Sequence, residues 1–125
     1  MILVDSDVLV EQLRGNPAAR DWLVEVRRTR GRLRASQVTA VELLGGMRSD
    51  ERHRVRALVD SLELLDVDGR VARQAGVLMR QFRRSHSGIG LADYLIAATA
   101  QVQGLELATL NIRHFPMVEG LSPPF

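Results

Sequence analysis

The chain opens with Met1-Ile-Leu-Val-Asp5-Ser-Asp7-Val-Leu9, an apolar run that stops at an aspartate. Such a run is typical of a parallel strand that helices cover on both faces. In open α/β sheets, ligands bind at the carboxyl ends of the strands. We therefore expect Asp5 at the rim of a binding crevice, with Ser6 and Asp7 in the turn behind it.

The rest of the chain alternates predicted helices with short predicted strands, which favours an α/β fold with a right-handed, mostly parallel sheet. No internal repeat or second domain is evident, so residues 1–125 are expected to form one domain, with residues 121–125 trailing along its surface. Besides the opening strand, we expect strands at 33–36, 63–67 and 105–110, and helices at 6–14, 17 to about 30, 37 to about 47, 50–62, 69–84 and 91 to about 103.

The composition limits the chemistry that is available. The 125 residues include no cysteine, which excludes a disulfide framework and a thiolate metal site. All 17 basic residues are arginine, so any mechanism that needs a lysine amine is excluded. The sequence pI of about 10.3 is a weak pointer to an anionic partner. We see no leader and no long apolar run, and we expect a cytoplasmic protein with no membrane segment.

Three further polar residues are candidates for a site with Asp5. Glu42 lies in mid-helix among apolar neighbours, where a desolvated carboxylate is costly unless a partner compensates it; a solvent-facing position is the alternative. Asp93 lies in the first turn of a helix, where an acidic residue also complements the helix dipole. Asn111 follows the last predicted strand as Asp5 follows the first, although asparagine is also a common turn residue.

Together these residues would form a site made only of oxygen ligands. Carboxylate and amide oxygens without histidine or cysteine suit Mg²⁺ or Mn²⁺, which bind phosphate oxygens alongside carboxylates. The use that follows is phosphodiester hydrolysis, in which the metal generates a nucleophile from bound water. Arginine suits phosphate contact, which makes Arg83, Arg84 and Arg113 weak candidates for RNA binding; a solvated face or a protein contact is the alternative for each arginine cluster.

The ordered set of motifs resembles the PIN-domain nucleases, specifically the VapC-type toxins of toxin–antitoxin pairs. The resemblance covers essentially the whole chain, including its length and the arginine-rich middle. The motifs are Leu3-Val-Asp5-Ser-Asp7-Val-Leu9, Val41-Glu42-Leu-Leu44, Leu91-Ala-Asp93-Tyr-Leu-Ile-Ala-Ala-Thr-Ala100 and Thr109-Leu-Asn111-Ile-Arg-His-Phe115.

The resemblance implies an α/β/α sandwich and a Mg²⁺- or Mn²⁺-dependent endoribonuclease, with tRNA and rRNA as candidate substrates. It also implies a homodimer and a cognate VapB-type antitoxin that inserts a peptide at the active site. On matching positions, Asp5, Glu42 and Asp93 would be the metal-binding acidic triad, and Ser6 would support them. The family often has a fourth acidic residue at or near Asn111, where this chain has an amide, with His114 close by.

Three other functions are alternatives to a nuclease. An apolar strand followed by Asp-x-Asp is also similar to haloacid-dehalogenase-type phosphatases, but these are usually longer and carry a late acidic pair. A receiver domain would need a lysine near its phosphoryl site, and the chain has none. The third alternative is a domain that binds RNA or a partner without cleaving it, which the amide at Asn111 favours.

Overall fold

The structure is a computed structural model that describes residues 1–125. Its centre is a four-stranded sheet in the order β3-β2-β1-β4, and every neighbouring pair of strands is parallel. The predicted parallel α/β fold is confirmed. The elements are β1 (Ile2–Val4), α1 (Ser6–Leu13), α2 (Pro17–Arg30), β2 (Arg34–Ser36), α3 (Gln37–Gly46), η1 (Ser49–Glu51), α4 (Arg52–Asp60), β3 (Glu63–Leu65), α5 (Gly69–Phe82), α6 (Leu91–Gln103), β4 (Glu106–Ala108) and η2 (Ile112–His114).

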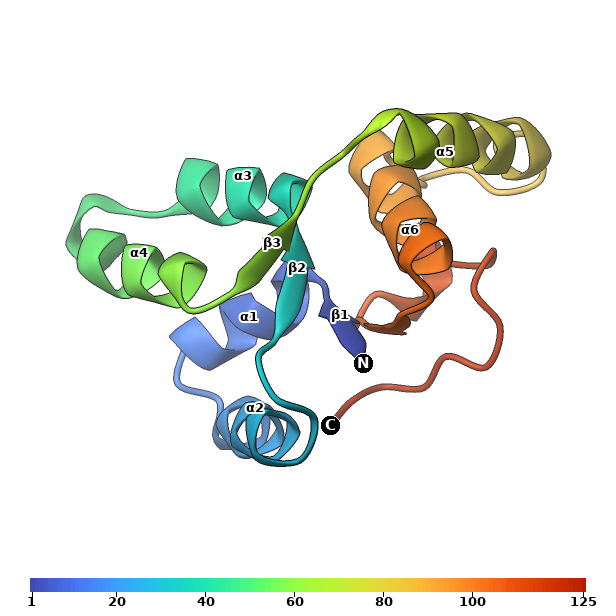
Figure 1. Cartoon of the computed structure of the whole chain (residues 1–125). Coiled ribbons are helices and arrows are strands. Elements are labelled where there is room, and N and C mark those ends of the chain that lie inside the picture. Colours follow the sequence, from blue (N-terminus) through green and yellow to red (C-terminus); the bar gives the residue numbers. More distant parts are fainter.

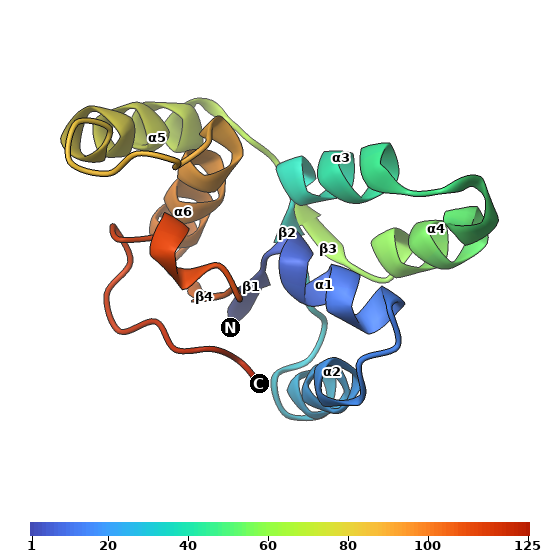
Figure 2. The same ribbon diagram turned by 180° about the vertical axis from the view of Figure 1, so that it is seen from behind.

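The first strand is apolar on both faces because each face packs against a separate core. Leu3 and Val4 are both fully buried, but they belong to different hydrophobic clusters, as the alternation of side chains along a strand requires. The cluster around Val4 is built mainly with α1 to α4, and the cluster around Leu3 mainly with α5 and α6. Figures 1 and 2 show these helix groups on opposite sides of the sheet, which is the predicted sandwich.

Two strands lead into helices without a connecting loop. Asp5 directly follows β1 and is the N-cap of α1, and Ser36 ends β2 and is the N-cap of α3. Each side chain accepts a hydrogen bond from a backbone N–H of its helix, which satisfies one of the free donors at the helix start. The carboxyl edge of the sheet therefore carries two helix N-termini side by side.

Several predicted boundaries were wrong by a few residues. The last strand is Glu106–Ala108 rather than 105–110, because Thr109 and Leu110 leave the ladder to contact Asp7. The expected helix at 50–62 is divided into η1 and α4. The third strand ends at Leu65 and the long helix at Phe82, each about two residues earlier than expected.

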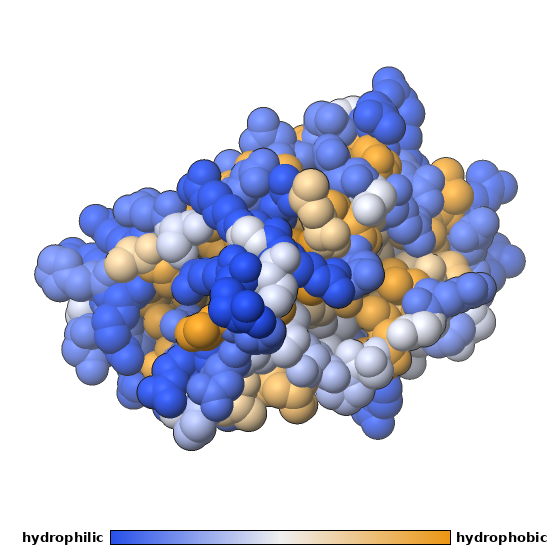
Figure 3. All heavy atoms as spheres, turned by 60° about the horizontal axis from the view of Figure 1, so that its bottom comes forward, coloured by the Kyte–Doolittle hydropathy of each residue, from blue (hydrophilic) through white to orange (hydrophobic).

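The C-terminal segment follows the surface as predicted and ends in an aromatic contact. Phe125 is partly buried, and its ring centroid lies 6.4 Å from that of Trp22 on α2. The face in Figure 3, which is the lower side of Figure 1 turned forward, is mainly hydrophilic with separate apolar patches. None of the helices combines the length and the apolar character needed to cross a membrane.

Candidate active site

Asp5 lies at the carboxyl end of β1, where the sequence places it. It is only 5% exposed. Its Oδ1 accepts a hydrogen bond of 2.8 Å from the Ser6 backbone N–H, and its Oδ2 accepts one of 2.9 Å from the Thr109 hydroxyl. Burial, and after it the negative charges of Asp7 and Glu42, raise the pKa of Asp5 to about 7 despite these hydrogen bonds.

Asp7 and Thr109 belong to the same hydrogen-bond network, although the sequence alone assigns a role to neither residue. The Oδ2 atom of Asp7 accepts hydrogen bonds from the Thr109 hydroxyl at 3.2 Å and from the Leu110 backbone N–H at 3.0 Å. Its Oδ1 is buried without a hydrogen-bond partner, and burial raises the pKa of the carboxyl group. The only indication of this contact in the sequence is that Thr109, a hydroxyl residue, directly follows β4, the strand that pairs with β1.

Glu42 comes to the group from α3. The Ser6 hydroxyl donates a hydrogen bond of 3.2 Å to Glu42 Oε1, which is consistent with the supporting role expected for Ser6. Partial burial of the carboxyl group is the main cause of the raised pKa of Glu42, and the charges of Asp93 and Asp7 add to it. The expected desolvation of Glu42 is only partial, because the residue as a whole is exposed and the adjacent Val41, which is 70% exposed, does not cover it.

Asp93 is held at the start of α6 by two other segments. Its Oδ2 atom accepts a hydrogen bond of 3.0 Å from the Gly90 backbone N–H and lies 3.1 Å from His114 Nδ1. Asn111 Nδ2 lies 2.8 Å from the same imidazole nitrogen. Asn111 therefore contacts His114, which in turn contacts Asp93, so it lies beside the acidic group, and its catalytic role stays a prediction.

The donor set fits a hard divalent cation, although the side chains are not preassembled around one. Asp5, Asp7 and Glu42 make no ion pair with a basic residue, so their charges have no compensating partner in the protein. The unpartnered Asp7 Oδ1 is a free ligand atom in the same group. No three His, Asp or Glu side chains are arranged to hold an ion as they stand. The roles of Asp5, Glu42 and Asp93 as metal ligands stay predictions.

The three arginines predicted to contact RNA lie in two places. Arg83 and Arg84 follow the end of α5, and Arg113 is in η2 next to His114. All three are exposed, and none makes an ion pair or a side-chain hydrogen bond within the protein. They are free to bind an anion, and their role in RNA binding stays a prediction.

The fold and the acidic group match a known family over nearly the whole chain. The profile described as PIN domain matches residues 2–120. The chain belongs to the PIN-domain family. It is 58% identical to Ribonuclease VapC10 of Mycobacterium tuberculosis, over all of this chain and 93% of that protein. It is 42% identical to Ribonuclease VapC19 of the same organism, over the full length of both.

Solved structures show the same PIN-domain fold. A toxin–antitoxin complex from Klebsiella pneumoniae superposes with a TM-score of 0.82 at 22% identity, covering 100% of this chain and 98% of that one. The DNA-bound VapBC of Salmonella typhimurium superposes with a TM-score of 0.76 at 25% identity, covering 98% and 95%. The resemblance to VapC-type PIN domains is confirmed, and the phosphatase and receiver alternatives are excluded.

Proposed function

We propose that this PIN domain is a divalent-metal-dependent endoribonuclease, the toxin of a toxin–antitoxin pair. The observation that carries the proposal is the group of carboxylates at the carboxyl edge of the sheet, in which Asp5, Asp7 and Glu42 have no basic partner and the pKa of Asp5 is raised to about 7. Clustered carboxylates of this kind repel one another, and a bound cation relieves that repulsion. The two relatives named ribonucleases, at 58% and 42% identity, support the same activity.

In the proposed mechanism Asp5, Glu42 and Asp93 hold the ion, and Asp7 Oδ1 is available as a further ligand. Mg²⁺ or Mn²⁺ would supply an acidified water as nucleophile and would neutralise charge on the phosphoryl group. Thr109 orients Asp5, and Ser6 orients Glu42. Asp5 must lose its proton before it can bind the cation, so activity is expected to rise with pH through about 7.

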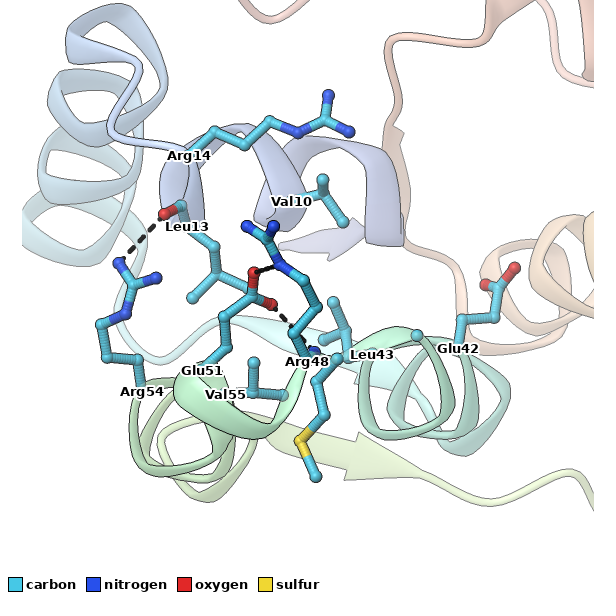
Figure 4. A pocket seen from close by; sticks show the side chains of 11 residues that line it. Val10, Leu13, Arg14, Glu42, Leu43, Arg48, Glu51, Arg54 and Val55 are labelled. Atoms are coloured by element: carbon cyan, nitrogen blue, oxygen red, sulfur yellow. Dashed lines mark hydrogen bonds and ion pairs between the residues drawn. The ribbon is translucent and has the colours of Figure 1, made fainter.

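The pocket next to Glu42 suits an antitoxin segment. It has a volume of about 710 Å³ and lies between α1, α3 and η1, with Glu42 at one end (Figure 4). Leu13, Leu43 and Val55 give it an apolar wall, while Arg14 and Arg48 lie on its rim. An apolar peptide that carries a basic or amide side chain would cover this wall and reach the acidic group. We propose this pocket as part of the VapB-type antitoxin site; the neighbouring structures that are VapBC complexes support it.

RNA as substrate also implies a cytoplasmic location, and the family implies a homodimer. We therefore include the cytoplasmic location and the homodimer in the proposed function. The dimer is tested by the molar mass of the purified protein in light scattering, where a mass near twice 13.9 kDa is expected.

The experiment that tests the activity is cleavage of a mixed pool of tRNA and rRNA by the purified chain. Parallel reactions contain Mg²⁺, Mn²⁺ or EDTA, with Asp5→Asn as the control protein. Discrete fragments that require metal and Asp5 are expected, and their ends identify the RNA target. Fragments that persist in EDTA and with folded Asp5→Asn would point to a contaminating nuclease and contradict the proposal.

A second candidate function is RNA or partner binding without cleavage. The observation that favours it is the absence of a fourth carboxylate at Asn111, whose side chain contacts His114 instead. A pure binding domain would bind RNA equally well with EDTA and would give no fragments with either metal.

A further inference from the structure

Positive charge gathers in two segments of the chain, residues 26–41 and residues 69–92. Residues 69–92, which cover α5, the following link and the start of α6, contain five arginines and no Asp or Glu. The other 101 residues contain 12 arginines and 15 acidic residues. Residues 26–41 also contain five arginines and no acid, but all of these are engaged: Arg28, Arg30 and Arg34 form ion pairs, and Arg27 and Arg32 donate side-chain hydrogen bonds. The five arginines of residues 69–92 make neither kind of contact.

Three of these arginines surround a hollow at the end of α5. The hollow has a volume of about 470 Å³, and its lining consists of Arg80, Arg83 and Arg84 with Gly76 and Met79. All three arginines are exposed, and none makes an ion pair or a side-chain hydrogen bond. Elsewhere the arginines are often occupied: Arg28, for example, binds both carboxylate oxygens of Glu25. The hollow is therefore a group of free guanidinium donors.

The hollow is remote from the acidic group. The helix α5 begins near the carboxyl edge of the sheet, three residues after β3, and its 14 residues extend for about 21 Å away from it. Figures 1 and 2 show α6 starting beside the beginning of α5, with the link that precedes it running back along that helix. Asp93 therefore lies near one end of α5, and the arginine hollow lies at the other end.

We propose that Arg80, Arg83 and Arg84 form a second binding site for the phosphodiester backbone of RNA, which anchors the substrate at a distance from the scissile bond. The inference rests on the proposed ribonuclease function. Planar guanidinium groups bind phosphate oxygens in pairs, and such contacts dominate the affinity of proteins for nucleic acid. An extended RNA strand spans the separation of about 20 Å in about four nucleotides, so an RNA of about three nucleotides cannot reach both sites.

A second copy of the chain is a poorer occupant of the hollow. In a two-fold symmetric dimer whose axis passes through the hollow, the arginines of one copy would face those of the other. No acidic residue lies within residues 69–92 to neutralise them. The hollow thus suits a polyanion better than a symmetric protein contact.

Binding is measured in the Asp5→Asn background, so that RNA is not cut. The triple variant Arg80→Gln/Arg83→Gln/Arg84→Gln is compared with Arg52→Gln/Arg56→Gln, which removes exposed arginines without ion pairs from α4. Fluorescence anisotropy uses labelled mixed-sequence RNA of about 24 and about three nucleotides, at salt from about 50 to 200 mM. For the longer RNA, we expect the triple variant to lose roughly ten- to a hundredfold in affinity and its salt slope to fall by about two.

Gly76 provides an independent pair of variants. No atom lies within 4 Å of the position that a Cβ would take at Gly76, so a side chain fits there. Gly76→Glu brings a carboxylate to the hollow, whereas Gly76→Gln adds nearly the same volume without the charge. We expect Gly76→Glu to weaken binding of the longer RNA about tenfold more than Gly76→Gln does.

The proposal is overturned if the triple variant binds the longer RNA as the α4 control does, or if it weakens both RNA lengths equally. If the triple variant changes the molar mass of the purified protein but not its RNA affinity, the hollow is a protein contact instead. The ribonuclease function is tested separately, in the otherwise unaltered chain, by the effect of Asp5→Asn on cleavage. If the chain cleaves RNA with metal but its arginine variants bind RNA normally, only the proposal of a second binding site is contradicted.

Discussion

The Thr109 hydroxyl donates a hydrogen bond of 2.9 Å to Asp5 Oδ2 and so ties the end of β4 to the end of β1. Thr109 is fully buried, and its oxygen also accepts a hydrogen bond from the Asn111 backbone N–H. A hydroxyl that donates to a carboxylate favours the charged form, and it therefore opposes the burial that raises the pKa of Asp5. Thr109 therefore orients Asp5 and limits the rise in its pKa that burial and the charge of Asp7 cause.

Replacing Thr109 by valine is expected to impair both properties. Valine keeps the shape but leaves Asp5 Oδ2 without its donor, which raises the pKa of Asp5 further. We expect cleavage and Mn²⁺ affinity to fall at least tenfold at pH 7, measured by single-turnover kinetics and calorimetry, and Thr109→Ser to restore most of both. The control is Thr99→Val, which removes another buried hydroxyl, bonded to the Leu95 carbonyl. Equal losses in Thr109→Val and Thr99→Val would show that the effect is merely structural.

The stability of the metal-free protein is expected to fall as the pH rises. The pKa of Asp5 is raised from 3.8 to about 7, so the folded chain binds this proton more tightly than the unfolded chain. The resulting stabilisation is complete below about pH 4 and is lost through about pH 7, with a total of up to about 4 kcal/mol. The raised pKa values of Asp7 and Glu42 act in the same direction.

Denaturant unfolding in EDTA at pH 5 and pH 8 measures this effect. Asp5→Asn is expected to be more stable than the wild type at pH 8 and to show a weaker dependence on pH. Adding Mn²⁺ at pH 8 should stabilise the wild type more than the variant, because the cation compensates the carboxylates. A wild-type free energy of unfolding that increases from pH 5 to pH 8 would contradict the account.

Glu42→Gln is expected to separate function from stability. Glu42 is exposed, and its amide replacement can still accept the hydrogen bond from Ser6, so the melting temperature should change little or rise slightly. Loss of the charge should reduce cleavage at least tenfold. The matched control is Glu119→Gln, an exposed carboxylate that lines a pocket with Ile2 and Leu105 outside the acidic group. A large loss of stability in Glu42→Gln, with cleavage otherwise retained, would support a structural role.

The sequence predicts the sheet well because its signals are local. The apolar run before Asp5 predicts the first strand. Ser36 and Asp68 are residue types that favour helix N-caps, and each precedes a helix and accepts a capping hydrogen bond. The contacts of the site are not local. Thr109 meets Asp5 across 104 residues, and His114 meets Asp93 across 21, so no spacing along the chain reveals them. The sequence suggests that Glu42 has apolar neighbours that bury it. The fold instead exposes the neighbouring Val41 to solvent, which the sequence alone does not reveal.

Asn111→Asp introduces an acidic residue where the family often has a fourth one. It tests whether this position is part of the site. The new carboxylate would lie beside His114, which already contacts Asp93, and it would add a negative charge next to the acidic group. We expect Mn²⁺ to bind several-fold more tightly, measured by electron paramagnetic resonance of free Mn²⁺. Asn16→Asp is the control, because Asn16 caps α2 and aspartate caps helices equally well. Unchanged affinity in Asn111→Asp would place Asn111 in an ordinary turn.

The most direct test of the central claim is the single-turnover cleavage rate at one mapped RNA site, compared between the wild type and Asp5→Asn at saturating Mn²⁺ and pH 8. Circular dichroism first establishes that both proteins are folded. The acidic group is predicted to be the catalytic centre, so Asp5→Asn should be slower by about a thousandfold, or roughly 4 kcal/mol of transition-state stabilisation. A folded Asp5→Asn that cuts the same bond within a few-fold of the wild-type rate would contradict the account.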